Sequence, residues 1–143
     1  MKSGFTLIEL MITVTIVILL SGASHATFLN FRETNAAKND ADNVAERLRT
    51  VQTKATAVEV PTACVNGVTG YVANFSGTLL SVTATCPGVG NVAVANLALT
   101  LVSSTFQSAG SVTFQSRTIS AGDTNICLTG SGNLFKIVVN RAA

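Results

Sequence analysis

Charged side chains are scarce in this sequence. Asp, Glu, Lys and Arg make up 11% of its 143 residues, and the formal net charge is +2. Beyond Val60 the charged residues are Arg117, Asp123, Lys136 and Arg141, whereas Ser, Thr, Asn and Gly are abundant. A surface of hydroxyls, amides and glycine is typical of an extracellular β-rich domain and argues against a cytosolic one. A net charge this small does not indicate a nucleic-acid or acidic partner.

Histidine is nearly absent as well. The single histidine is His25, and the region beyond it that would form a folded head offers Glu59 and Asp123 as carboxylates. General acid–base catalysis needs positioned titratable groups, and Cys127 has no histidine in the head to activate it as a nucleophile. No Gly-rich phosphate loop precedes a helix, and no CxxC or Cys/His spacing indicates zinc. We therefore predict that the protein is not an enzyme and needs no metal or cofactor.

Proline is rare, and the first of the two prolines is Pro61. The length suits one domain plus an anchor, and neither an internal repeat nor a long linker interrupts the chain. Three cysteines, at 64, 86 and 127, make an odd count. In an exported protein this count predicts one disulfide and one free thiol.

The sequence is rich in one long apolar run, which extends from Phe5 to Leu20 and contains one carboxylate, Glu9. A helix from Phe5 to about Phe31 would be roughly 40 Å long, enough to cross a bilayer core of about 30 Å. A Glu inside a membrane helix is unfavourable by about 3 kcal/mol, so it needs a partner or a role.

The residues before and within this run, Lys2-Ser3-Gly4-Phe5-Thr6-Leu7-Ile8-Glu9, resemble the class III signal of bacterial type IV pilins and type II secretion pseudopilins. The resemblance implies that a prepilin peptidase cuts after Gly4 and methylates the new amino terminus at Phe5. It also implies a role for Glu9, which would neutralise the Phe5 amine of a neighbouring subunit. That ion pair would set the axial register as subunits stack.

Two other interpretations of the N-terminus stay open. A Sec signal peptide would use the same apolar run and be cut before Thr27, but it gains nothing from Glu9 or from Gly4-Phe5. The other alternative is a plain single-span anchor.

A second helical pattern follows the apolar run. One apolar stripe recurs at steps of three and four: Ala37, Ala41, Val44, Leu48, Val51, Ala55 and Val58. Charges on the other faces, which include Asp40, predict a solvated surface or contacts between subunits, with Glu46 and Arg49 able to pair. We expect Pro61 to end this helix, because the residue before a proline favours extended geometry.

Beyond Pro61 the pattern changes to β. A hairpin is predicted around Ser76-Gly77, and a closing hairpin around Gly130–Asn133. Further strands are predicted within 92–102 and at 111–115. The fold class is therefore α+β and similar to the type IV pilin fold, with a long N-terminal helix packed on an antiparallel sheet. The expected divisions are a leader at 1–4, a transmembrane and filament-core helix at 5–29, an amphipathic helix at 30–60 and an extracellular head at 61–143.

The cysteine positions favour one pairing. Cys64 follows Pro61, and Cys86 ends the strand that returns from the first hairpin, so both are expected at the same end of that hairpin. Cys127, between two apolar residues, is expected to be a buried and inert thiol.

The resemblance predicts a structural subunit of a type IV pilus or type II secretion pseudopilus. It would lie in the inner membrane before assembly and in a periplasmic or extracellular filament afterwards. Its expected partners are other pilin subunits, the prepilin peptidase and the inner-membrane assembly platform. Residues 45–55 and the order of the last strands are similar to H-type pseudopilins and FimT-like minor pilins. The alternative is a DNA-uptake or adhesion pilin, whose ligand would contact Arg117, Lys136 and Arg141.

Overall fold

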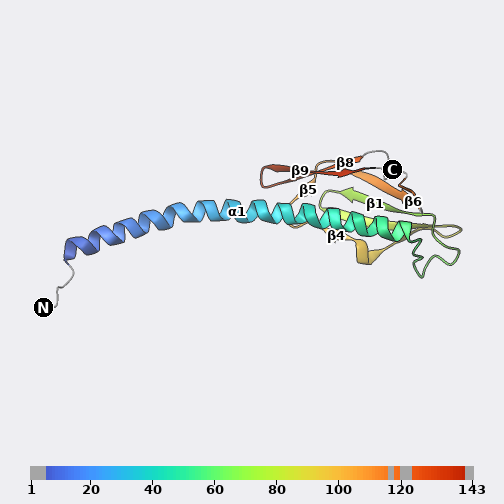
Figure 1. Cartoon of the computed structure of the whole chain (residues 1–143), viewed down its shortest axis with the longest axis horizontal. Coiled ribbons are helices and arrows are strands. Elements are labelled where there is room, and N and C mark those ends of the chain that lie inside the picture. The colour runs from blue at the N-terminus through green and yellow to red at the C-terminus, as the bar shows by residue number, and fades with distance from the viewer. Residues whose placement is uncertain (1–5, 116–117, 120–123, 141–143) are drawn as a thin grey trace.

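The computed structural model describes residues 6–115, 118–119 and 124–140, apart from the side chains of 23–27 and 118–119. One long helix, α1 (Leu7–Thr56), extends well beyond a head of β-strands that packs along its second half (Figure 1). The architecture is α+β, as predicted, and is consistent with the type IV pilin-like fold.

Helix α1 begins at an N-cap, Thr6, whose hydroxyl accepts a hydrogen bond from the Glu9 N–H across 3.4 Å. This bond satisfies one of the free donors of the first turn. The helix runs without interruption through Gly22, although a glycine is unfavourable by about 1 kcal/mol in a helix interior. The expected halves, 5–29 and 30–60, therefore form one continuous helix within its described length.

The predicted end of the helix at Pro61 is wrong by several residues. α1 ends at Thr56, because the Val58 and Glu59 N–H groups bond back to the carbonyls of Ala55 and Lys54. These two bonds close a Schellman motif, with Val58 in the left-handed conformation at φ 53°. A β-branched residue is unusual there, so the sequence carries no glycine signal for this end.

Within the described residues, the head contains two antiparallel sheets. The larger has the order β3-β2-β1-β6-β7, with β4 also pairing with β2. Its strands are β1 (Gly70–Ser76), β2 (Leu79–Cys86), β3 (Gly90–Ala93), β4 (Leu99–Thr100), β6 (Gly110–Gln115) and β7 (Thr118–Ile119). The smaller has the order β5-β8-β9 and consists of β5 (Thr105–Phe106), β8 (Thr124–Gly130) and β9 (Asn133–Val139). A short 3-10 helix, Ala95–Leu97, precedes β4.

Both predicted hairpins are confirmed. β1 pairs with β2 around Gly77, and β8 pairs with β9 around Ser131 and Gly132. Ser131 and Gly132 both have positive φ, as a two-residue turn that matches strand twist requires. The sequence did not predict the pairing of β1 with β6, nor the division into two sheets.

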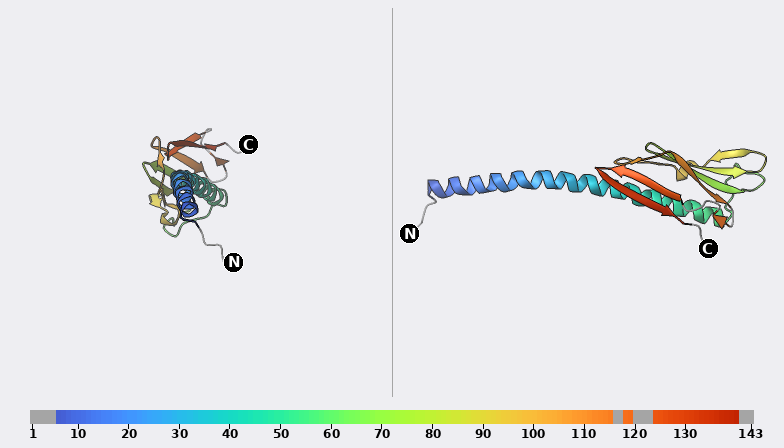
Figure 2. Two further views of the ribbon diagram at one scale, coloured as in Figure 1. Left: turned by 90° about the vertical axis from the view of Figure 1, so that its left-hand side faces the viewer. Right: turned by 90° about the horizontal axis from the view of Figure 1, so that it is seen from above.

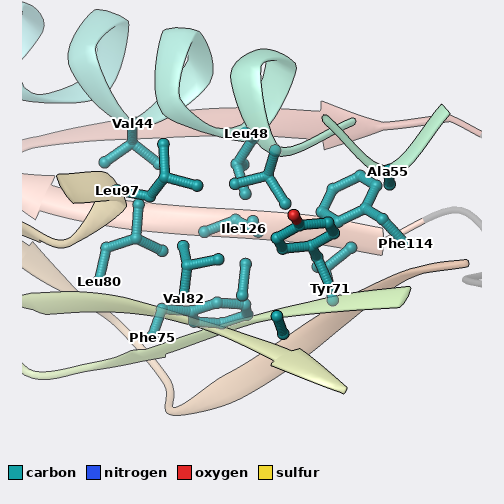
Figure 3. Packing of buried hydrophobic residues seen from close by; sticks show 14 of the residues in the cluster. Val44, Leu48, Ala55, Tyr71, Phe75, Leu80, Val82, Leu97, Phe114 and Ile126 are labelled. Atoms are coloured by element: carbon teal, nitrogen blue, oxygen red, sulfur yellow. The ribbon is translucent and has the colours of Figure 1, made fainter. Parts of the chain in front are cut away.

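The core lies between the inner face of α1 and the two sheets, as Figure 3 shows for Val44 and Leu48 of the helix. Six stripe residues are buried, namely Ala37, Ala41, Val44, Leu48, Val51 and Ala55. The sheets contribute large buried side chains, among them Tyr71, Leu80, Phe114, Ile126 and Leu128. Val58, predicted to continue the stripe, is 37% exposed because it lies beyond the helix end.

Candidate assembly site

The free half of α1 presents a nearly continuous apolar surface. The exposed large apolar side chains between Leu7 and Leu20 are Leu7, Ile8, Leu10, Met11, Ile12, Val14, Ile16, Val17, Ile18, Leu19 and Leu20. They lie on every side of the helix and do not form a single stripe like the one that packs against the head. Apolar patches of this extent mark surfaces that contact protein or lipid.

The hydroxyls of Thr13 and Thr15 in this segment are satisfied within the helix. The Thr13 hydroxyl donates to the Leu10 carbonyl across 3.0 Å, and the Thr15 hydroxyl donates to the Met11 carbonyl across 2.7 Å. Such back-bonding leaves no hydroxyl needing water. The segment is therefore suited to apolar surroundings. In the part of the chain that the structure describes, however, no helix has the length and apolar character that a membrane crossing requires.

Glu9 lies in the first turn of α1 and is exposed. A carboxylate there is stabilised by the positive end of the helix dipole. Its predicted partner, the amine of Phe5, and the cleavage position Gly4 both lie outside the described residues. The ion pair between subunits therefore stays a prediction.

The boundary between the free and covered parts of α1 is marked by polar contacts with the β8–β9 turn. Ser131 donates to the Glu33 carboxylate across 3.2 Å, and the Asn133 amide approaches the Thr34 hydroxyl at 3.5 Å. Gly130 makes this approach possible, since a Cβ atom there would come within 2.7 Å of the Ala37 Cβ. The hairpin turn therefore fixes where the head begins along the helix.

Asp40 links the helix to the head through three hydrogen bonds. It was predicted on a solvated face, and this is wrong, because its side chain is 8% exposed. Its carboxylate accepts hydrogen bonds from the N–H groups of Val102 and Ser103, across 3.1 and 2.8 Å. The Ser104 hydroxyl adds a third bond. The carboxylate thus provides the acceptor for the hydrogen-bond donors of a loop that no strand pairs with.

The structure pairs the two cysteines that the sequence analysis paired. Cys64 and Cys86 form a disulfide, with their Cα atoms 5.3 Å apart. Cys127 is free, but its predicted burial is wrong, since it is only half-buried. It faces away from the core on β8, whereas its neighbours Ile126 and Leu128 face inward.

Of the three predicted ligand contacts, Lys136 is exposed on β9. Arg117 and Arg141 lie outside the described residues, so their clustering with Lys136 stays a prediction.

The helix charges that find partners in the described residues are not the expected pair of Glu46 and Arg49. Lys54 pairs with Glu59 beyond the helix end, and Arg47 donates to the Asn96 carbonyl across 3.3 Å.

Comparison with known proteins gives one match. Residues 1–24 match the family model described as the prokaryotic N-terminal methylation motif. No curated protein and no solved structure shows a significant match to the chain. The matched segment covers the predicted cleavage position, Glu9 and the start of the exposed apolar helix. The chain therefore carries the N-terminal methylation motif that is characteristic of type IV pilins and pseudopilins, joined to a head and helix arranged as in the pilin-like fold.

Proposed function

We propose that this protein is a structural subunit, a minor pilin or pseudopilin, of a type IV pilus or type II secretion pseudopilus. The observation that supports it is the continuity of the methylation motif at 1–24 with an exposed apolar helix that projects from the head. Such a helix needs apolar neighbours, and identical helices in a bundle supply them. The motif is that of a structural subunit and not of an enzyme.

The proposed pathway has two stages. The precursor is inserted in the inner membrane through the apolar run from Phe5 to Leu20, and the prepilin peptidase cuts after Gly4. The assembly platform then moves the subunit into a filament in the periplasm or outside the cell. Glu9 recruits it by meeting the Phe5 amine of a neighbour, since two charges in apolar surroundings are stabilised when they pair. Similarity of 45–55 to H-type pseudopilins and FimT-like minor pilins supports a place in that branch.

A photocrosslinking experiment separates this function from a plain membrane anchor. A photoreactive residue replaces Met11 or Ile18, both exposed on the free helix. In cells with the assembly machinery we expect adducts with other pilin subunits. In cells lacking the assembly platform, which serve as the control, we expect adducts with lipid only. Lipid adducts alone in both strains would contradict the filament role.

The alternative, a head that binds DNA or an adhesion ligand, would require the three cations to act together. Lys136 alone among them is described, so no observation favours this function over the structural one. Retention of the purified chain on DNA with a steep salt dependence would support it, because phosphate contacts release counterions.

A further inference from the structure

Strand β9 has an open edge. It ends the order β5-β8-β9, and no strand in the described ranges pairs with its outer side. Open edges present free N–H and C=O groups to any extended chain that reaches them. Natural edges are shielded by charges, prolines or bulges, and β9 carries one such feature, Lys136.

The register identifies which backbone groups are free. The Cys127 carbonyl accepts a hydrogen bond from the Gln107 N–H across 2.9 Å, so the backbone of Cys127 faces β5. Cys127 lies opposite Lys136, and this pair is therefore one of the non-hydrogen-bonded pairs of the ladder. The N–H and C=O of Lys136 thus face outward. Because the pattern repeats every two residues, those of Leu134 and Val138 do so too.

A groove runs along this edge. It lies between β9 and α1, and Figure 2 shows the strand following the covered half of the helix. One part of about 380 Å³ lies between Ala41 and Ala45 of the helix and Phe135–Val138 of the strand. A second part of about 160 Å³ continues from Ala45 towards Gln52. The small side chains of Ala41 and Ala45 leave room for the inward side chains of an added strand.

The charge around the groove is mostly positive. Lys38 and Arg49 lie on its helix side and Lys136 on its strand side, with Asp42 as the carboxylate among the lining residues. Lys136 is also the central residue of β9. If β9 paired in full antiparallel register with a second copy of itself, Lys136 would lie opposite its own counterpart. Like charges directly opposite are destabilising, so this register opposes self-pairing.

We propose that the β9 edge binds an extended strand of a different polypeptide, with acidic residues at its outward positions and apolar residues at its inward positions. The added strand continues the sheet through the backbone of Leu134, Lys136 and Val138. An acidic residue faces Lys136, and apolar side chains enter the groove over Ala41 and Ala45. This inference does not depend on the filament role, because it concerns only the head and the half of α1 that the head covers.

The test uses the full chain in detergent micelles and labelled synthetic peptides as long as β9. The probe alternates valine and glutamate, and its matched partner alternates valine and lysine. By fluorescence anisotropy the glutamate peptide is expected to bind, and the lysine peptide is not. Lys136→Glu is expected to weaken binding of the glutamate peptide about fivefold to tenfold and to favour the lysine peptide. Arg32→Glu, a charge reversal on α1 outside the groove, is the control and leaves binding unchanged.

Backbone pairing is tested separately. A glutamate peptide with alternate amides N-methylated keeps its charge but cannot pair with the edge, so it is expected not to bind. Hydrogen exchange of the chain is expected to slow at the amides of Leu134, Lys136 and Val138 and to stay unchanged at Phe135 and Ile137. Equal binding of the methylated peptide would overturn the inference. So would equally tight binding of a single-stranded oligonucleotide, which would assign the groove to polyanions in general.

Discussion

The carboxylate of Asp40 accepts a hydrogen bond from the Ser104 hydroxyl across 3.0 Å, although the two residues are 64 positions apart in the sequence. The N–H groups of Val102 and Ser103 donate to the same carboxylate oxygen. Asp40 therefore holds the loop before β5 against the helix. A buried carboxylate with three donors is stabilising, whereas donors left without an acceptor are costly.

Asp40→Ala is expected to lower the free energy of unfolding by about 2–3 kcal/mol, because three donors lose their common acceptor. Asp42→Ala is the matched control. Asp42 is exposed and follows the stripe residue Ala41, so its replacement should change stability by less than about 0.5 kcal/mol. Urea unfolding of both variants followed by circular dichroism measures the difference. Equal losses would show that the Asp40 bonds add nothing specific.

The protein's stability should fall at alkaline pH through Tyr71. Burial raises the pKa of this phenol above 10.0, and the nearby Glu59 carboxylate raises it further. The folded state then holds a proton that the unfolded chain has already lost, so stability is unaffected below about pH 10 and decreases above it. Tyr71 is the only tyrosine and there is no tryptophan, so tyrosinate absorbance reports this residue alone.

Tyr71→Phe tests the role of the same phenol by removing its hydroxyl. The Tyr71 hydroxyl donates to the Glu59 carbonyl across 2.6 Å, and its loss is expected to cost about 1 kcal/mol at neutral pH. The variant should lose less stability than the parent between neutral and strongly alkaline pH. A Tyr71 titration at the ordinary value in the folded protein would contradict the assignment.

Glu9→Val should abolish or strongly reduce incorporation into filaments while leaving membrane association intact. The substitution removes the proposed partner of the Phe5 amine and makes the helix more apolar. Thr13→Val is the control, because it removes an exposed polar group from the same helix without removing charge. Immunodetection in sheared filament fractions gives the readout, and undiminished incorporation of the Glu9 variant would exclude the recruitment role.

Processing is expected between Gly4 and Phe5, with a methylated Phe5 at the new terminus. Mass analysis of the N-terminal peptide from the exported protein measures it. A mature chain beginning at Thr27 would instead identify a Sec signal peptide and remove the basis of the filament proposal.

The Cys64–Cys86 disulfide should stabilise the head by about 3 kcal/mol, since it closes a loop with a sequence separation of 22. Replacing both cysteines with serine should lower the thermal midpoint, whereas Cys127→Ser should have a small effect because that thiol is only half-buried. Peptide mapping without reduction checks the pairing. A disulfide peptide that contains Cys127 would be inconsistent with it.

Some features of this protein are determined by sequence neighbours alone. The apolar stripe from Ala37 to Ala55 follows the helical period, and the turn at Ser131-Gly132 lies between two alternating segments, so both could be predicted. The same holds for Glu9, whose position relative to Gly4 and Phe5 is a matter of spacing. Local periodicity and turn chemistry need no knowledge of distant residues.

Other features were decided only by the tertiary structure. The burial of Asp40 depends on which loop packs against its face of α1. The end of the helix depends on two hydrogen bonds that the Val58 and Glu59 N–H groups donate back to the last turn. The open edge of β9 depends on the division of the strands into two sheets, because β9 is the last strand in the order β5-β8-β9. These pairings join residues far apart in sequence. Their choice rests on the packing of the whole head, which no local pattern specifies.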